Sequence, residues 1–299
     1  MKLLVIGHCA LDVRHLADGT ESEAYGGVLN PARSLSALIE RSDRVVPIFG
    51  AHKSEMAPLL EHLRAMPGVD TSGIFASETP MHRVHVVDRG EGVRLECAEV
   101  PAGPIPFERI RKHLDCDGIL INMVSGFDLT LETLDEIRMA VRGQGIPIHF
   151  DFHNLTLGIR GNHERFRRPL PEWRRWAFMV DTLQLNEEEI VGLSVEQLSE
   201  SQTAGHLLTL GVQGVVVTRA ERGVTLYRNE HKCLVREDVP AVSGPGVEDS
   251  IGRGDTLGAA FLLAVVQRAP LIEAARYAVR VAGGYMERFQ EGHAHVTPG

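Results

Sequence analysis

The segment at residues 249–256, with the sequence DSIGRGDT, places two carboxylates and two glycines directly before a stretch with helical apolar spacing. Apolar residues recur there at Leu257, Phe261, Ala264 and Val265, an interval that predicts a helix starting within the segment. Glycines let a backbone approach a ligand closely, and the amides of a first helical turn have no partner within the helix. Because these amides lie at the positive end of the helix dipole, the pattern predicts an anion-binding site.

Asp255 lies within this predicted anion site. A carboxylate there can accept a proton from a hydroxyl group while neighbouring amides hold a phosphoryl group, and phosphoryl transfer depends mainly on such positioning and charge stabilisation. The residues alone leave a second interpretation open, in which Asp255 only caps an ordinary glycine-rich helix start. A Rossmann dehydrogenase is disfavoured, because Gly7-His8-Cys9-Ala10 after the first apolar run does not provide G-x-G-x-x-G.

The DSIGRGD stretch resembles the DTxGAGD signature of the ribokinase-like, PfkB-type carbohydrate kinases, and further motifs follow that family's order along nearly the whole chain. The resemblance implies an ATP-dependent phosphotransferase that phosphorylates a hydroxyl of a sugar or sugar-like molecule. It also implies that Asp255 is the general base, that the amides of Gly252, Arg253 and Gly254 form the anion hole, and that Asp249 contacts the nucleotide.

Two other motifs resemble the family's donor side. Asn186 and Glu189 match its N-x-x-E motif, which implies that Asn186 contacts the nucleotide and that Glu189 binds Mg²⁺. Thr218 and Gly223 match a strand and turn beside the nucleotide. Without the resemblance, the acidic residues after Asn186 also fit the first turn of an ordinary helix. The stretch from Thr218 to Gly223 likewise fits an ordinary strand-turn-strand.

The acceptor side rests on the N-terminal motifs. The family places an Asp after its first strand to bind substrate hydroxyls, and Asp12 is the candidate. Gly26, Gly27 and Asn30 resemble its G-G-x-x-x-N-x-A element, although Asn30 also suits a helix N-cap before a proline at the first helical position. His153 stands at the Asn of the family's D-x-N as a candidate substrate contact, whereas a lone histidine is more often structural.

The chain departs from the family pattern at several positions. Arg253 replaces a small alanine of the signature, Ser250 replaces a threonine, Ala220 stands where glycine is usual, and only two residues separate Gly27 from Asn30. These departures support an alternative function, a non-catalytic sugar or nucleotide sensor with the same fold. A nucleoside kinase is the alternative within the kinase class, and a monovalent-cation requirement stays open.

Residues 160–175 carry six arginines against two glutamates in an otherwise acidic chain. Arginine forks suit carboxylates and phosphates, so an anionic acceptor such as a sugar acid or sugar phosphate is one hypothesis. The other hypothesis is that these arginines lie on a solvent-exposed face of a helix and bind no ligand.

The elements that must position these residues are short apolar runs alternating with helix-length amphipathic stretches, which predict an α/β fold with a largely parallel sheet. The resemblance makes it a ribokinase-like three-layer fold. The expected strands, each read as buried on both faces, are Leu3–Ile6, Val45–Phe49, Gly118–Ile121, Pro147–Phe150, Thr182–Leu185 and Val215–Thr218. The expected helices include Pro31–Glu40, Ser54–Ala65, Leu131–Arg142 and Glu187–Gly192.

One region breaks this alternation. Two runs between residues 80 and 100 alternate polar and apolar residues around the turn DRGEG and predict a β-hairpin. We expect a single kinase domain over residues 1–299 with a small β-flap lid, contributed mainly by about 12–25 and 80–100. The family resemblance allows a homodimer through this lid.

Composition limits the partners. The net charge of −9 in 299 residues disfavours nucleic-acid binding, because phosphate contacts need a basic surface. The four cysteines have no C-x-x-C spacing, so neither a zinc site nor a disulfide framework is indicated. The apolar run Leu3–Ile6 is too short for a signal peptide or a membrane span, and we expect a cytoplasmic protein without a membrane partner.

Overall fold

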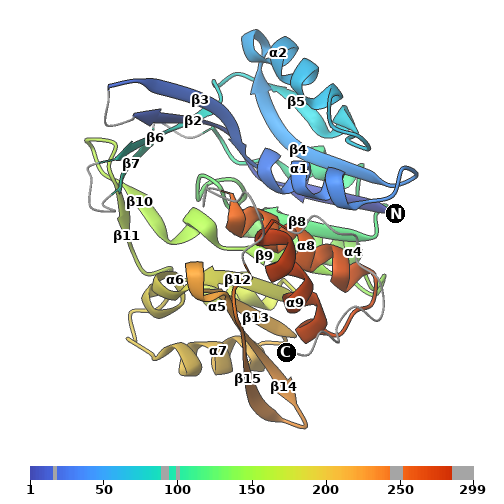
Figure 1. Ribbon diagram of the computed structural model, residues 1–299, viewed down its shortest axis with the longest axis vertical. Helices are drawn as coiled ribbons and strands as arrows, with labels where there is room; N and C mark the ends of the chain where they lie inside the picture. The colour runs from blue at the N-terminus through green and yellow to red at the C-terminus, as the bar shows by residue number, and fades with distance from the viewer. Residues whose placement is uncertain (16–18, 89–93, 99–101, 243–251, 285–299) are drawn as a thin grey trace.

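Figure 1 shows the computed structural model, which describes residues 1–15, 19–88, 94–98, 102–242 and 252–284. In this part of the chain nine strands form one sheet, from β15 at one edge to β5 at the other. Their order is β15 (Cys233–Val239), β14 (Val224–Glu230), β13 (Gly214–Thr218), β12 (Thr182–Asn186), β9 (Ile148–Asp151), β8 (Gly118–Asn122), β1 (Lys2–Ile6), β4 (Arg44–His52) and β5 (Ile74–Ser77). Pairing is parallel from β13 to β5 and antiparallel between β13, β14 and β15.

Helices follow most of these strands. They are α1 (Leu29–Leu38), α2 (Lys53–Arg64), α3 (Phe107–Arg111), α4 (Leu131–Val141), α5 (Trp173–Phe178), α6 (Glu187–Gly192), α7 (Glu200–Thr209), α8 (Arg253–Val266) and α9 (Leu271–Ala282). Helix α8 packs against α1 and α9, whereas α3, α4, α5 and α7 contact one another in a row.

Two ring contacts show that helices cover both faces of the large sheet. His149 and Phe150 are successive residues of β9, so their side chains point to opposite faces. The His149 ring centroid lies 5.1 Å from that of Phe261 on α8, and the Phe150 centroid lies 5.7 Å from that of Trp176 on α5. The molecule is therefore a three-layer α/β structure, as the sequence predicted.

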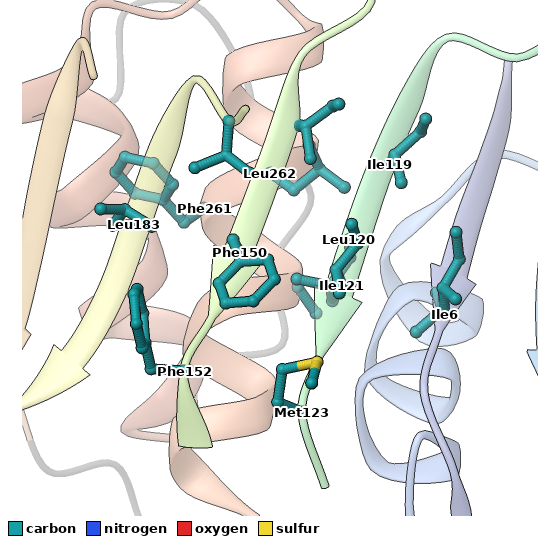
Figure 2. Packing of buried hydrophobic residues seen from close by; sticks show 14 of the residues in the cluster. Ile6, Ile119, Leu120, Ile121, Met123, Phe150, Phe152, Leu183, Phe261 and Leu262 are labelled. Carbon is teal, nitrogen blue, oxygen red and sulfur yellow. The ribbon is translucent and has the colours of Figure 1, made fainter. Parts of the chain in front are cut away.

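Figure 2 shows the packing around the central strands. Phe150 on β9 lies between Leu183 of β12 and Ile121 of β8, with Phe261 and Leu262 of α8 behind the strands. All five side chains are completely buried. Burial of large apolar side chains is the main favourable term in folding, and residues of this kind on both faces hold the two helical layers against the sheet.

A second sheet of four strands extends from the large one (Figure 1). It has the order β3 (Glu21–Gly27), β2 (Cys9–His15), β6 (His82–Asp88) and β7 (Arg94–Ala98). The chain enters it directly after β1 and leaves it two residues before α1, so the flap is joined to the first strand and first helix of the main layer. A short hairpin of β10 (Leu157–Ile159) and β11 (Arg165–Arg167) completes the sheets.

All six expected strands are present, most of them extended by one or a few residues. As expected, β9 and β12 are buried on both faces, but one of the two faces is polar rather than apolar. Their buried residues alternate, with Phe150 and Leu183 on one face and His149, Asp151 and Gln184 on the other. Among the described residues, no helix has the length and apolarity needed to span a membrane.

Candidate active site

The site is organised by the first turn of α8. Gly252 precedes the helix with φ of 77°, a left-handed conformation that favours glycine, and the N–H of Thr256 donates to the carbonyl of Gly252 at 2.9 Å. The amides of Arg253, Gly254 and Asp255 therefore lie in the turn whose N–H groups have no intrahelical acceptor. Asp255 is within the helix, three residues after its N-cap, so the capping interpretation was wrong. Asp249, Ser250 and Ile251 lie outside the described residues.

The Asp255 carboxylate is buried and receives two side-chain amides. Asn30 Nδ2 donates to Oδ2 at 3.0 Å, and Asn122 Nδ2 donates to Oδ1 at 2.6 Å. His153 Nε2 lies 3.9 Å from Oδ1. The expectation that Asn30 caps a helix was also wrong, because α1 begins one residue earlier and its N-cap is Val28. Instead Asn30 joins the start of α1 to the start of α8.

A cleft of about 720 Å³ lies on the other side of this turn. Arg253 and Gly254 line it from α8, Asn186 from the end of β12, and Thr218 and Gly223 from the end of β13 and its turn. The rest of its lining is Glu187, Glu188, Ala220, Glu221, Ala241, Val242, Leu257, Val279, Ala282 and Gly283. The described residues expected to contact the nucleotide thus share one cleft with the predicted anion hole.

The turn after β13 has two residues with positive φ, although one of them is an alanine. Ala220 adopts φ of 48°, the positive range that glycine tolerates best. Gly223 has φ of 94°, and a Cβ on it would lie 2.1 Å from the carbonyl oxygen of Val239. Arg219 holds the turn against neighbouring helices through ion pairs with Glu187, at 2.6 Å, and with Glu200.

Asn186 and Glu189 form a capping box at the start of α6. The Asn186 side chain accepts from the Glu189 N–H at 2.8 Å, and Glu189 accepts from both the backbone N–H and the side-chain amide of Asn186. Burial raises the pKa of Glu189. No group of three or more His, Cys, Asp or Glu residues suitable for a metal ion occurs in the described part of the chain.

The acceptor candidates lie where the flap joins the main layer. A Cβ on Gly26 would be 2.2 Å from Oδ2 of Asp12, so the missing side chain makes room for that carboxylate. Gly27 has φ of 61°, and a Cβ there would lie 2.6 Å from the carbonyl oxygen of His8. His153, the other candidate, has φ of 40° and presents its ring to Asp255.

Five of the six arginines in the arginine-rich segment form ion pairs or hydrogen bonds. Arg167, Arg174 and Arg175 pair with Glu188, Glu196 and Asp135, and Arg160 pairs with Glu164. Arg165 is buried and donates to His82 Nε2 at 2.9 Å. These contacts favour the solvated-face interpretation for most of the segment over an anion-binding one.

Sequence analysis missed Asn122, Asp151 and Gln184. Asn122 and Asp151 are the last residues of β8 and β9, and their polar side chains at strand ends were the available signal. Gln184 lies inside a strand and gave no such signal. Gln184 Nε2 donates to Asp151 Oδ2 at 2.9 Å and to the carbonyl oxygen of Gly254 at 3.0 Å.

Comparisons with known proteins agree with this arrangement. Residues 162–291 match the model of the pfkB family carbohydrate kinases. A ribokinase of Arabidopsis thaliana is 28% identical over 153 residues, 49% of this chain, and the match spans only 36% of that relative's length. Its structure with ribose and ATP superimposes with a TM-score of 0.70 and 20% identity, covering 94% of this chain and 91% of that one.

Two other solved structures have the same fold. A sulfate complex of a pyrophosphate-dependent kinase in the ribokinase family has a TM-score of 0.78 at 18% identity, covering 96% of each chain. A nucleoside kinase of Burkholderia thailandensis with inosine has a TM-score of 0.70 at 17% identity, covering 95% of this chain and 90% of that one. At these identities the superpositions show the fold. The matched C-terminal segment and the ribokinase relative show that part of the chain is similar to the pfkB family carbohydrate kinases.

Proposed function

We propose that this protein is a kinase that transfers the γ-phosphate of ATP to a hydroxyl of a sugar-like small molecule, with Asp255 as the general base. The observation that carries the proposal is the position of Asp255: a buried carboxylate, held by two carboxamides, in a helix turn whose free amides border a cleft. A base beside an anion hole provides the two main requirements of phosphoryl transfer.

The contacts of Asp255 orient it for this role. Each carboxylate oxygen accepts one amide hydrogen, from Asn30 or from Asn122, which fixes the plane of the group and leaves lone pairs for an acceptor hydroxyl. The acceptor O–H would donate to Asp255 as its oxygen attacks the phosphorus. The first-turn amides of α8 would then stabilise the charge on the transferring phosphoryl group.

The cleft next to this turn fits a nucleotide. Its volume, its apolar wall of Val242, Val279 and Ala282, and the glycine at residue 283 suit an adenine base, while Arg253 and the α8 amides suit its phosphates. Mg²⁺ would be held mainly by those phosphates and water, with Glu189 as its protein carboxylate, and would neutralise phosphate charge when bound.

Pyrophosphate is the second candidate donor. Arg253, in the position of a small alanine, gives the cleft a cation beside the anion hole, and one structural neighbour is a pyrophosphate-dependent kinase. For the acceptor, Asp12 can bind two hydroxyls of a vicinal diol. A nucleoside also carries such a diol and is the alternative acceptor class, consistent with a nucleoside kinase among the neighbours. The lid role of the flap, a homodimer through it and a cytoplasmic location stay predictions.

A phosphotransfer screen tests the proposal. Sugars, sugar acids, inositols and nucleosides are offered with ATP or pyrophosphate, and phosphorylated product is detected directly. We expect turnover with at least one pair, and Asp255→Asn should lower kcat by about 100-fold or more, the size of a general-base contribution. Asp115→Asn, the same change at an exposed residue, is the matched control. Ligand binding without turnover would identify a sensor and refute the kinase function.

A further inference from the structure

The face of the large sheet beneath α8 carries a row of buried polar side chains. His149 and Asp151 lie two residues apart on β9, and Thr182 and Gln184 lie opposite them on β12. All four are 6% exposed or less. Central parallel strands covered by helices usually present aliphatic side chains, so four polar residues here cost stability unless their contacts compensate.

The four side chains form two hydrogen-bonded pairs. His149 Nδ1 and Thr182 Oγ1 lie 2.8 Å apart, and Gln184 donates one amide hydrogen to Asp151 and the other to the carbonyl of Gly254. Asp151 also accepts from the backbone N–H of His153 at 3.1 Å. Because both partners of Gln184 Nε2 are acceptors, the carboxamide has one favourable orientation and is held at both hydrogens.

The hydrogen bond from Gln184 to the Gly254 carbonyl affects the anion hole because this carbonyl and an anion-hole amide belong to the same peptide group. The carbonyl of Gly254 and the N–H of Asp255 belong to one planar trans peptide, so they point in opposite directions. Gln184 holds that carbonyl from the sheet side. The Asp255 N–H belongs to the peptide that Gln184 contacts, so this hydrogen bond restrains the first turn of α8 at the residue proposed as the base.

Gly258 provides the space for this arrangement. A Cβ at residue 258 would lie 3.2 Å from Gln184 Oε1 and 3.4 Å from His149 Nε2. A larger residue one helical turn after Gly254 would press on the Gln184 carboxamide directly. The glycine at residue 258 of α8 thus leaves space for the polar side chains of β9 and β12 beneath the helix.

We propose that Gln184, held by Asp151, is a positioning residue that aligns the anion-hole amide and the backbone of Asp255 by binding the Gly254 carbonyl. It touches neither the donor nor the acceptor. The inference rests on the proposed function for its kinetic consequence, but the bond from Gln184 to the first turn of α8 also has a structural consequence that can be measured without turnover.

Gln184→Met tests the proposal, because methionine has similar length and no amide. Its matched control is Thr203→Val on α7, whose buried hydroxyl has no hydrogen-bond partner among the described residues. Gly258→Ala is the second variant: it keeps every hydrogen-bonding group and crowds the carboxamide. Each protein is assayed for kcat and for KM of donor and acceptor, and amide hydrogen exchange is followed in peptides covering residues 252–260.

We expect Gln184→Met to lower kcat about 10- to 100-fold, as small misplacements of reacting groups do, with both KM values within about threefold of wild type. Exchange in residues 256–258 should accelerate, while peptides from α9 stay unchanged. Gly258→Ala should shift both readouts in the same direction, and it decides the matter alone if Gln184→Met does not fold. Wild-type kcat and unchanged exchange in Gln184→Met or, failing that, in Gly258→Ala would overturn the proposal.

A failure of the proposed function looks different. If the wild-type protein transfers no phosphate to any acceptor, the kinetic comparison gives no result. Hydrogen exchange at residues 256–258 should still depend on Gln184 if this residue positions the first turn of α8. Faster exchange without wild-type turnover would support the positioning role and refute the kinase. If the wild-type protein is an active kinase but hydrogen exchange is unchanged in the variants, the kinase function stands and the positioning role is refuted.

Discussion

Asp151→Asn gives a test of the polar row that needs no substrate. Asp151 is 6% exposed at the end of β9. Burial raises the pKa of its carboxyl from 3.8 to about 8; the charges of Asp255 and Glu189 act in the same direction, while His153 opposes them through its charge and its backbone N–H. The folded protein therefore keeps a proton on Asp151 that the unfolded chain has released.

The sign of the effect follows from proton counting. Between pH 4 and pH 8 the folded state binds about one proton more than the unfolded state at this residue, so the free energy of unfolding falls as pH rises. The slope is about 1.4 kcal/mol per pH unit, or about 2.7 kcal/mol between pH 5 and pH 7. Burial lowers the pKa of His82 and His149 to about 3 and 4, so these groups add stability as pH rises toward 6.5, in wild type and variant alike.

Denaturant unfolding at pH 5, 6, 7 and 8 measures the difference between the two proteins. Asparagine keeps the size of Asp151 and cannot ionise, so the stability of wild type relative to Asp151→Asn should fall by about 1.4 kcal/mol per pH unit up to about pH 8. The same substitution at exposed Asp115 should leave the pH dependence of wild type unchanged. Parallel stability curves for wild type and Asp151→Asn would show that the folded carboxyl is ionised in this range and would refute the reasoning.

Three further predictions concern the site. Asn122→Leu removes one of the two amides on Asp255 and should lower kcat about 10- to 100-fold, the rate equivalent of one hydrogen bond to a charged group; a loss below twofold in steady-state kinetics would exclude that role. Gly26→Ala places a Cβ 2.2 Å from the Asp12 carboxylate and should raise the acceptor KM without changing the donor KM, whereas Gly161→Ala, with no atom within 4 Å of its Cβ, should change neither. Glu189→Gln can keep the capping-box bond from the Asn186 backbone N–H but loses the second bond, from Asn186 Nδ2, so chemical denaturation should show a loss of about 1 kcal/mol, while the Mg²⁺ concentration at half-maximal rate should increase; an unchanged Mg²⁺ requirement would assign Glu189 to the helix cap alone.

Much of the fold was accessible from the sequence, because its strands are short apolar runs with turn residues between them. The run from Gly214 to Thr218 is an example: it has no competing helical period, and its strand was placed to within one residue. The start of α1 was placed late because Asn30-Pro31 suits an N-cap and a first helical position. The contact that overrides this local preference, from Asn30 to Asp255, joins residues 225 positions apart and has no local signal.

The same limit applies to the site. Residues that belong to motifs, such as Asp255, Asn186 and Thr218, were found because their neighbours in the sequence are distinctive. Asn122 was missed because it is a single polar residue in an apolar strand, and Gln184 because the alternating polar residues of its strand were not interpreted as a face; only the register of β8, β9 and β12 shows what they face. The alternation of polar and apolar residues in β9 and β12 was visible, and it indicated a polar face that the assumption of two apolar faces concealed.

The polar face of β9 and β12 affects the charges around the first turn of α8. An anion hole must accept a phosphoryl group, yet the carboxyls of Asp255, Asp151 and Glu189 lie near it, and two unit charges 4 Å apart repel by several kcal/mol at the effective dielectric of a protein. Burial raises the pKa of Asp151 to about 8 and also raises the pKa of Glu189, and the proton that Asp151 keeps at neutral pH reduces the negative charge near the turn. Asp255 differs from them in accepting two side-chain carboxamide N–H groups, from Asn30 and Asn122. Two neighbouring carboxyls can therefore serve as hydrogen-bond acceptors for Gln184 and Asn186 while the third serves as the base.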